Sequence, residues 1–438
     1  EARLAVAMKE DARMTASLTD ADFLAALRAI VGEAQVLTQG ADQAAYLTES
    51  RGLWNGRALA VVRPATTQEV SRVVALCHAQ SRSVTPHGGG TGLVGGQIAD
   101  DPRGIALSLA RLDKVREVDA ASNTMTVEAG VTLAAAQDAA AKADRLFPLS
   151  LASEGSCTIG GNLSTNAGGT AVLAYGNARD LTMGVEVVLA DGRVMSALSK
   201  LRKDNTGYDL KNLFVGAEGT LGVITAAVLK LAPRPRSVET AFVGLETPEQ
   251  ALELLTLAQK HAGPQLTSFE LIPRIAVDLA LRHIPDIRDP LADENEWYVL
   301  LELSSTAASG LDETMAGLLE EGLEQGLIDD AAVAASGQQR GDFWRLRESI
   351  SEAQRREGGS IKHDVSVPVA RVPEFLDIAS EAVLDMEPEA RIVAFGHVGD
   401  GNIHFNVSQP VGADKQAFLD RWTVMNALVH EIVLEMGG

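Results

Sequence analysis

Cysteine and positive charge are both scarce in this sequence of 438 residues. It contains two cysteines, Cys77 and Cys157, which is too few for the disulfide framework of a small secreted protein and suits a reducing compartment. Lysine and arginine total 38 against 59 aspartates and glutamates, so the formal net charge is −21. A field of that sign repels nucleic acid and anionic membrane surfaces, which argues against both as partners.

Long hydrophobic runs are also missing. No apolar segment approaches the roughly 20 residues that span a bilayer, and residues 1–13 lack the apolar core and cleavage site of a signal peptide. We therefore expect a cytoplasmic location without a transmembrane segment. Cys77 falls on an apolar helical face with Val70, Val73 and Val74, which predicts a buried thiol rather than a reactive one.

Strands and helices alternate as far as about residue 232, and glycine-rich loops separate them. The segment "APRPRS" at 232–237 predicts a domain connection, because its two prolines break the pattern. The alternation predicts an α+β protein of two domains that join near residue 234. The expected helices cover 20–31, a segment opened by Thr66, 247–261, 311–325, 342–356 and 414–436; a strand is expected in "WYVLLELSS", and hairpins at Asp191–Gly192 and at 391–408.

The stretch "TPHGGGTGLVGGQ" at 85–97 contains the spacing Gly90-x-Gly92-x-x-Gly95 of a dinucleotide-binding fingerprint. That fingerprint needs a helix opening at its third glycine. Here Gly95 is followed by "GQIADDPRG", where Pro102 and turn residues prevent a helix. We therefore reject a Rossmann-type NAD site at this loop.

The glycines still predict an anion site, because backbone N–H groups of consecutive glycines converge on an anion without a Cβ in the way. A second loop of the same character, "EGSCTIGGNLSTNAGGT", covers 154–170. Two such loops suit a large cofactor with a pyrophosphate group. From the residues alone, a bare flexible turn is the alternative.

A histidine hairpin is predicted in "RIVAFGHVGDGNIHFNVSQP" at 391–410. Asp400–Gly401 indicates a two-residue type I′ turn, in which His397 faces His404 and Asn406 projects from the same face. Two imidazoles placed in this way can share a metal ion at about 2.0–2.1 Å per bond. A pair of hydrogen-bonded histidines on a sheet is the alternative that the residues leave open.

Basic residues upstream of this hairpin predict an anion clamp. Arg347 and Ser351 are four residues apart on one helical face, and Lys362 follows the loop "GGS" at the start of a strand. In an acidic protein, an arginine fork and a lysine from two elements suggest a site for a carboxylate. A solvated helix face, which neighbouring arginines also suggest, is the alternative.

Four motifs in order, "PHGGGTGLVGG", "PLSLASEGSCTIGGNLSTNAGGT", "YGNARDLTMGVEVVLADG" and "GYDLKNLFVGAEGTLGVIT", resemble the FAD-binding domain of vanillyl-alcohol oxidase type. They are most similar to those of the FAD-dependent D-2-hydroxy-acid dehydrogenases, in the branch that oxidises D-2-hydroxyglutarate. The resemblance covers residues from about 40 to the end. It implies an N-terminal extension and helix over 1–40, a two-subdomain FAD-binding domain over 41–233, a substrate domain with an antiparallel sheet and the metal hairpin over 234–415, and a C-terminal helix over 416–438 that returns toward the FAD domain.

The resemblance implies that FAD is bound non-covalently, with His87 a polar loop residue rather than a point of covalent attachment. The residues of the first loop that would lie against the FAD pyrophosphate are Pro86, Gly88, Gly89, Gly90, Thr91 and Gly92. Those that would line the flavin are Ser156, Gly160, Gly161, Asn162, Asn166 and Ile224.

The stretch "GHVGDGNIHFN" resembles the metal-binding hairpin of the family, with His397 and His404 as ligands of zinc or manganese and Asn406 in contact with substrate. Arg347, Ser351 and Lys362 match the substrate contacts of the family in residue type and spacing. In the family, a following segment carries a glutamate that completes the metal site and a histidine that acts as base. We expect both beyond Gly438.

The resemblance implies oxidation of a D-2-hydroxy acid, most closely D-2-hydroxyglutarate, to the 2-oxo acid by hydride transfer to flavin N5. Metal assistance would come from the ion on His397 and His404, and D-lactate or D-malate are alternative substrates. An electron-transferring flavoprotein or a quinone would reoxidise the flavin, and a homodimer is implied. A metal-dependent hydrolase that uses the histidine hairpin and a flavin-binding protein without activity are alternatives of other classes, but the hydrolase leaves the glycine loops without a role.

Overall fold

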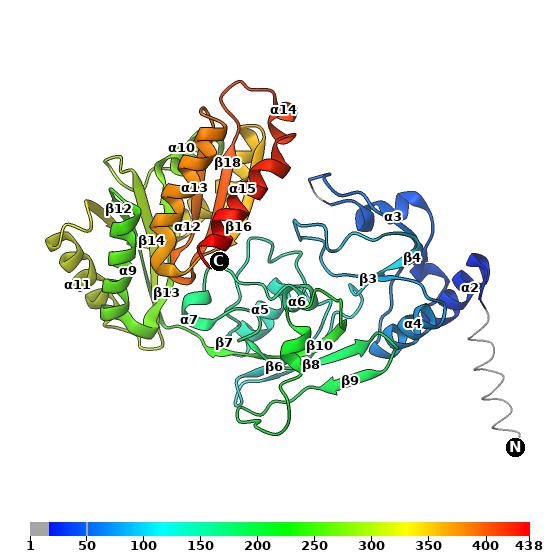
Figure 1. The fold of residues 1–438 in the computed structure, drawn as a ribbon. Helices are drawn as coiled ribbons and strands as arrows, with labels where there is room; N and C mark the ends of the chain where they lie inside the picture. The colour runs from blue at the N-terminus through cyan, green and yellow to red at the C-terminus, as the bar shows by residue number, and fades with distance from the viewer. Residues whose placement is uncertain (1–16, 50) are drawn as a thin grey trace, which may run out of the picture. The chain divides into compact units, whose positions relative to one another are not determined.

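The computed structural model describes residues 17–49 and 51–438 (Figure 1). The N-terminal residues tested for a signal peptide lie outside the described residues. The chain divides into two compact units: unit 1 holds the described residues up to Gly169 together with Tyr175–Arg234, and unit 2 holds Thr170–Ala174 together with Pro235–Gly438. The division after Arg234 falls inside the proline-containing segment.

The first sheet of unit 1 has the strand order β1-β2-β4-β3, and its β2–β4 and β4–β3 pairs are parallel. Its core packs Phe23, Leu27, Val73 and Cys77 from two helices against the strands. The strands are β1 (Val36–Leu37), β2 (Arg57–Val62), β3 (Val84–His87) and β4 (Asp100–Ser108), and the helices are α2 (Asp20–Val31), α3 (Gly40–Leu47) and α4 (Thr67–Ala79).

Helix α4 begins at a capping residue, Thr66, whose hydroxyl oxygen accepts the backbone N–H of Glu69. The Glu69 carboxylate accepts the N–H of Ala65 rather than that of Thr66. The predicted start of this helix, opened by Thr66, is therefore confirmed.

The second sheet of unit 1 is antiparallel, in the order β5-β6-β10-β8-β9. Its β8–β9 hairpin turns at Asp191–Gly192 as predicted, with Gly192 at φ 87°. The strands are β5 (Val115–Asp119), β6 (Thr124–Glu128), β8 (Thr182–Leu189), β9 (Val194–Ala197) and β10 (Gly222–Lys230); β7 (Arg145–Leu146) pairs with β11 (Ala232–Pro233), and the helices are α5 (Leu133–Lys142), α6 (Ile159–Ser164) and α8 (Lys211–Phe214). The short helix α7 (Val172–Tyr175) belongs to unit 2 except for Tyr175.

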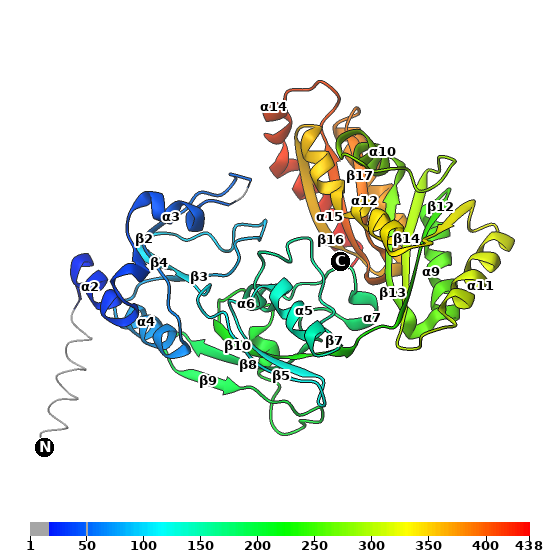
Figure 2. The same ribbon diagram turned by 180° about the vertical axis from the view of Figure 1, so that it is seen from behind.

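Unit 2 is built on an antiparallel sheet in the order β15-β12-β14-β13-β17-β18-β16. Helices α9, α11, α13 and α15 cover one face, and α10 and α12 cover the other (Figures 1 and 2). The strands are β12 (Ser237–Leu245), β13 (Leu266–Pro273), β14 (Trp297–Ser305), β15 (Asp330–Val333), β16 (Ser360–Ser366), β17 (Arg391–His397) and β18 (Asn402–Ser408); the helices are α9 (Pro248–Ala262), α10 (Arg274–His283), α11 (Leu311–Glu324), α12 (Gly337–Arg356), α13 (Val372–Met386), α14 (Lys415–Leu419) and α15 (Trp422–Glu435).

The predicted α+β fold class is confirmed, with one difference at the C-terminal end. The helix expected over 414–436 is two helices, because α14 ends at Leu419 and α15 begins at Trp422. Within residues 17–49 and 51–438, no helix is long and apolar enough to cross a membrane.

Candidate functional site

The first glycine loop leaves the end of β3 and leads into strand β4. No helix follows Gly95 in this described stretch, which confirms that the loop is not a Rossmann fingerprint. Gly90 and Gly95 have φ of 69° and 82°, values that side chains adopt only at a cost. These two backbone conformations allow the sharp turns that the chain makes between β3 and β4.

The two glycine loops touch each other through their backbones. A Cβ placed on Gly89 would lie 2.0 Å from the carbonyl oxygen of Ser156, and one on Gly88 would lie 2.6 Å from Thr158 Oγ1. The Thr158 hydroxyl is buried, with the residue 5% exposed, and has no hydrogen-bond partner among the described residues. Since buried polar atoms are almost always paired, this hydroxyl fits a bound group that carries a polar atom at the loops.

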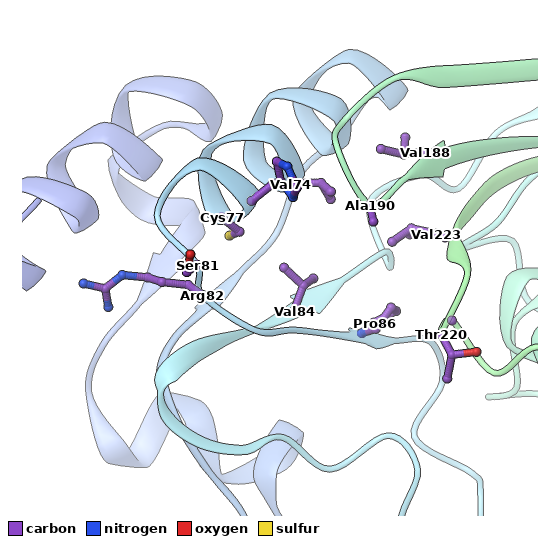
Figure 3. Close-up of a pocket in the computed structure, with 13 residues that line it drawn as sticks. Val74, Cys77, Ser81, Arg82, Val84, Pro86, Val188, Ala190, Thr220 and Val223 are labelled. Carbon is purple, nitrogen blue, oxygen red and sulfur yellow. The ribbon is translucent and has the colours of Figure 1, made fainter. Parts of the chain in front are cut away.

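A cavity of about 380 Å³ in unit 1 is lined in part by Pro86, at the start of the first glycine stretch (Figure 3). Its walls are both apolar and polar: Val74, Cys77 and His78 come from α4, Ser81 and Arg82 follow that helix, and Val84 and Pro86 come from β3. Cys77 is 1% exposed, so its predicted burial is confirmed, and this burial raises the pKa of the thiol to about 12. The remaining wall comes from β8 and β10 and the turns beside them, with Val188, Ala190, Gly219, Thr220, Gly222 and Val223.

Several predicted FAD residues have packing roles of their own. A Cβ on Gly160 would lie 2.6 Å from that of Ala129, and the Ile224 side chain is 3% exposed in the core of the second sheet. Asn162 is buried and its amide points to the Cys157 sulfur at 3.6 Å. Contacts of these residues with FAD stay a prediction.

Asn166 and His87 each interact with other residues of unit 1. Asn166 has φ 50° and accepts the backbone N–H of Arg179. His87 is 5% exposed, contacts the Gly88 carbonyl at 3.0 Å and packs edge-on against Tyr46. Its burial lowers the pKa of the imidazole, so His87 is a neutral, packed residue at the end of β3.

The histidine hairpin of unit 2 has a different turn from the predicted one. A 3₁₀ turn, η4 (Val398–Asp400), and Gly401 connect β17 to β18, so that His397 pairs with Asn402 and Phe395 pairs with His404. The prediction of a two-residue type I′ turn with His397 opposite His404 is wrong, because the turn takes up Val398 and Gly399 as well.

The two histidines nevertheless share a face of the sheet. The register differs by an even number of residues, which keeps His397 and His404 on the same side as diagonal neighbours. Their ring centroids are 5.4 Å apart at an interplanar angle of 79°. Two imidazoles bound to one ion at about 2.0–2.1 Å have centroids within about 6.5 Å of each other, so the spacing fits a shared ion.

Each imidazole has a carboxylate on its Nδ1 atom. Glu270 Oε1 lies 2.5 Å from His397 Nδ1, and Asp364 Oδ1 lies 3.2 Å from His404 Nδ1. A carboxylate in this position orients an imidazole so that Nε2 faces a metal ion, which is the usual environment of a metal-binding histidine. Among His, Cys, Asp and Glu residues of the described ranges, however, no group of three or more is placed to hold an ion.

Charge in this cluster follows from burial and close pairing. Burial would raise the pKa of Glu270, but the charges of His397 and Arg347 lower it to about 2. Burial would lower the pKa of His397, yet the Glu270 carboxylate raises it. Burial lowers the pKa of His404, although the hydrogen bond with Asp364 opposes that shift. The glutamate is thus ionised throughout the physiological range.

Arg347 is 7% exposed and directs its guanidinium at Glu270. Its Nη2 and Nε lie 2.7 and 3.0 Å from Glu270 Oε2, and its charge sits over the Phe395 ring at 4.7 Å. The guanidinium predicted to clamp substrate is therefore held by an internal carboxylate. Ser351 is exposed one turn farther along α12.

The other predicted residues lie nearby on the same sheet face. Lys362 of β16 pairs with Asn406 of β18, and Asn406 donates its amide to Gln354 Oε1 at 2.8 Å. The structure thus gathers Arg347, Lys362, Asn406 and the two histidines on the face that α12 covers.

Sequence reasoning missed Glu270 and Gln354. Glu270 is the one charge in the apolar run "LTSFELIP" of β13, and a lone charge in a buried strand is a signal of a partner. Gln354 follows Arg347 by two turns of α12. Neither signal identifies the partner, which lies far away in the chain.

Comparison with known families covers both units. Residues 58–197 match the family described as FAD binding domain, and residues 234–438 match FAD linked oxidases, C-terminal domain.

Curated relatives align with nearly the whole chain. The D-2-hydroxyglutarate dehydrogenase of Xanthomonas citri pv. viticola is 35% identical over 421 residues, which is 96% of this chain and 88% of the relative. The mitochondrial D-2-hydroxyglutarate dehydrogenase of Arabidopsis thaliana is 33% identical over 412 residues, 93% and 73% of the two chains. The D-2-hydroxyglutarate–pyruvate transhydrogenase of Saccharomyces cerevisiae is 33% identical over 398 residues, 89% and 80%. Since the plant relative is named mitochondrial, the cytoplasmic location stays a prediction.

Solved structures share the fold. Alkyldihydroxyacetonephosphate synthase matches with a TM-score of 0.75 at 18% identity, over 95% of this chain and 80% of that one. p-Cresol methylhydroxylase with substrate bound matches with a TM-score of 0.75 at 17% identity, over 94% and 86%. These likenesses show that the chain shares its fold with both solved structures.

Proposed function

Because this chain belongs to the FAD-dependent D-2-hydroxy-acid dehydrogenases of the vanillyl-alcohol oxidase type, we propose that it oxidises D-2-hydroxyglutarate to the 2-oxo acid. The observation that carries the substrate is that relatives named for D-2-hydroxyglutarate align with up to 96% of the chain. Family membership also decides against a metal-dependent hydrolase. D-Lactate and D-malate remain alternative substrates of the same reaction.

FAD would be held in unit 1 by the glycine loops. Gly88 and Gly89 allow the two loops to approach closely, and the unpaired Thr158 hydroxyl offers a hydrogen bond to a polar group bound there. When bound, FAD supplies the acceptor, flavin N5, for the hydride that leaves C2 of the substrate.

The substrate carboxylates would be recognised on the sheet face of unit 2. The Arg347 guanidinium, which Glu270 holds in place, and the Lys362 ammonium would both supply positive charge to the carboxylates of a dianionic substrate. The Asn406 amide nitrogen donates to Gln354, which leaves Oδ1 as the atom of this side chain that accepts a substrate O–H. Ser351 would add a hydrogen bond from α12.

A divalent ion, zinc or manganese, would be held by Nε2 of His397 and Nε2 of His404. When bound, the ion supplies Lewis-acid stabilisation of the charge that develops on the substrate hydroxyl. Glu270 and Asp364 would hold the two imidazoles in the orientation that this binding needs.

An electron-transferring flavoprotein or a quinone would take the electrons from the reduced enzyme, and the enzyme would act as a homodimer. The yeast relative named as a transhydrogenase with pyruvate adds a 2-oxo acid as a further class of acceptor. These partners are separable by stopped-flow reoxidation of the reduced enzyme with each acceptor.

The test is the visible spectrum of the purified holoenzyme without oxygen, before and after addition of D-2-hydroxyglutarate. We expect the flavin band to bleach with D-2-hydroxyglutarate and to persist with its L-enantiomer. Bleaching by D-lactate or D-malate alone would reassign the substrate. A protein that shows no flavin band after reconstitution with FAD would refute the assignment of the glycine loops.

A further inference from the structure

We infer that Glu270 is a positioning residue: it fixes the tautomer of His397 that leaves Nε2 free to bind a divalent ion. This inference rests on the metal-assisted reaction proposed above and deepens it by one residue. It also assigns a role to the buried carboxylate that the sequence motifs do not include.

The strand pairing brings the two residues together. Glu270 of β13 pairs directly with His397 of β17 in the antiparallel register, so their side chains leave the same face of the sheet. The Glu270 side chain is 1% exposed, and its Oε1 lies 2.5 Å from His397 Nδ1. Water cannot replace this contact without opening the sheet face.

The hydrogen-bond inventory of Glu270 fixes the proton on His397. Oε2 accepts from Nε and Nη2 of Arg347, and an ionised carboxylate accepts hydrogen bonds but donates none. At Oε1 the imidazole must therefore donate, which places a proton on Nδ1. A neutral His397 then carries its lone pair on Nε2, the nitrogen that is directed away from Glu270.

His404 provides an internal comparison. Its Nδ1 partner, Asp364, is 3.2 Å away and its side chain is 72% exposed, so solvent can take the place of this carboxylate at little cost. The hydrogen bond between carboxylate and Nδ1 is thus shielded from water by burial at His397, whereas water can replace the carboxylate at His404. The two carboxylates should differ strongly in their effect on metal binding.

The substitution Glu270→Gln tests whether His397 depends on the hydrogen bond from position 270 or only on a side chain that fills the space there. If its Oε1 accepts from the Arg347 fork, its Nε2 amide is directed at His397 and donates to Nδ1. The imidazole then keeps its proton on Nε2, where it blocks a metal ion. Glu270→Gln therefore reverses the tautomer while it preserves the shape of the side chain.

The experiment measures Zn²⁺ affinity of the full-length protein by competition with a chromophoric chelator, for wild type, Glu270→Gln and Asp364→Asn. We expect about a 10–100-fold loss of affinity for Glu270→Gln, the range typical of an orienting partner, and less than about a threefold loss for Asp364→Asn. Equal losses for the two variants, or none for Glu270→Gln, would overturn the inference while the metal proposal stands.

A double variant guards against a folding defect. Glu270→Gln leaves Arg347 buried without its counter-charge, whereas Glu270→Leu with Arg347→Met removes both charges and every hydrogen-bonding atom of the side chain at position 270. If Glu270 orients His397, the double variant recovers thermal stability but keeps the weak Zn²⁺ binding. Recovery of wild-type affinity in the double variant would show that Glu270 only balances Arg347, and would refute the inference.

A second measurement does not need metal. Proton–nitrogen correlation spectra of ¹⁵N-histidine-labelled protein, recorded metal-free at alkaline pH, identify the protonated ring nitrogen of His397. We expect Nδ1–H in wild type and Nε2–H in Glu270→Gln; an Nε2–H tautomer in wild type would overturn the inference. A wild-type protein with this expected spectrum that binds no divalent ion would refute the proposed metal and leave the positioning by Glu270 intact.

Discussion

The glycines of the two loops differ in whether a side-chain Cβ atom could be added without a clash. A Cβ on Gly89 would lie 2.0 Å from the Ser156 carbonyl oxygen, whereas one on Gly155 meets nothing within 4 Å. Neither residue has a positive φ, so steric room alone distinguishes them. This contrast provides a matched pair of substitutions for testing the FAD site.

We expect Gly89→Ala to weaken FAD binding by about tenfold or more, because relieving a backbone clash of this size costs about 1–3 kcal/mol. Gly155→Ala should bind FAD like wild type. The measurement is a titration of apoprotein with FAD, followed by the quenching of flavin fluorescence. Equal affinities for the two variants would remove the first loop from the cofactor site.

Arg347 is the residue where function and stability are hardest to separate. Truncation to alanine removes the charged partner of the buried Glu270 and leaves it with His397 alone, and breaking a buried ion pair in this way costs about 3–5 kcal/mol of unfolding free energy. Arg347→Lys keeps the charge but loses the planar fork. We therefore expect Arg347→Lys to lower kcat/KM for the hydroxy acid by about 100-fold with an unchanged flavin spectrum.

The control for that variant is Arg345→Lys, on an exposed position of the same helix. It should leave the steady-state kinetics as they are. If Arg347→Lys behaves in the same way, the clamp is absent and Lys362 alone supplies the charge that recognises the substrate.

Three elements of unit 2 are joined at their ends by a single carboxylate. Glu357, which caps the C-terminal end of α12, accepts hydrogen bonds from His283 Nε2 at 2.5 Å and Arg282 Nη1 at 2.8 Å, both near the end of α10. Arg391 at the start of β17 donates to its other oxygen. The hydrogen bond from His283, together with those from the two arginines, lowers the pKa of Glu357 to about 2.

This junction predicts a specific loss of stability in acid. The folded pKa lies below the unfolded value of about 4.3, so the stabilisation is fully present above that value and is lost as pH falls through about 2. We expect Glu357→Gln to lower the unfolding free energy by about 2–3 kcal/mol at pH 7, with a smaller difference at pH 3. Denaturant titrations at the two pH values measure it.

Glu374→Gln is the control for this prediction, because the Glu374 ion pair with Arg371 is exposed on α13. It should leave stability unchanged at both pH values. A Glu357→Gln protein whose deficit is as large at pH 2 as at pH 7 would show that packing, not charge, accounts for the effect.

The elements also show where sequence reasoning succeeds. Caps, apolar periodicity and turn residues are local, and they predicted α2, α4, β14 and the Asp191–Gly192 hairpin. The turn at Asp400–Gly401 misled the register because the same Asp-Gly pair also closes a longer turn with a 3₁₀ segment. The register differs from the predicted one by two residues, which keeps His397 and His404 on the same face of the sheet. The two histidines therefore lie together although the predicted turn was wrong.

What the sequence does not reveal is long-range pairing. Glu270 reaches His397 only because β13 and β17 become neighbours in the sheet, 127 residues apart in the chain. Gln354 accepts a hydrogen bond from Asn406 because helix α12 packs on the sheet, although the two residues are 52 positions apart in the chain. Such pairs depend on strand order and on the packing of helices on the sheet, which local patterns leave undetermined.

On the scale of the whole molecule, the two units have separate hydrophobic cores. We expect the two cores to unfold independently. Calorimetry of the metal-free apoprotein should therefore show two unfolding transitions. Free FAD at about 100 times its Kd adds about 2.7 kcal/mol to the unit that binds it. The transition of unit 1 should therefore move up in temperature with FAD.

The second transition should respond to Zn²⁺ and not to FAD, since His397 and His404 belong to unit 2. Tryptophan fluorescence identifies it, because Trp54 lies in unit 1 while Trp297, Trp344 and Trp422 lie in unit 2. A single transition that both ligands shift together would show that the units unfold as one body.

The short segment Thr170–Ala174 lies within the sequence of unit 1 but packs in unit 2. Its Thr170 carbonyl accepts the Ser268 hydroxyl at 2.7 Å, and Leu173 lies where a Cβ on Gly399 would come within 3.0 Å of it. A gene fusion that exchanged everything after residue 234 between two relatives would leave these five residues behind. In such chimeras, residues 170–174 of one protein should pack poorly against the turn between β17 and β18 of the other, unless these five residues are exchanged together with the C-terminal half.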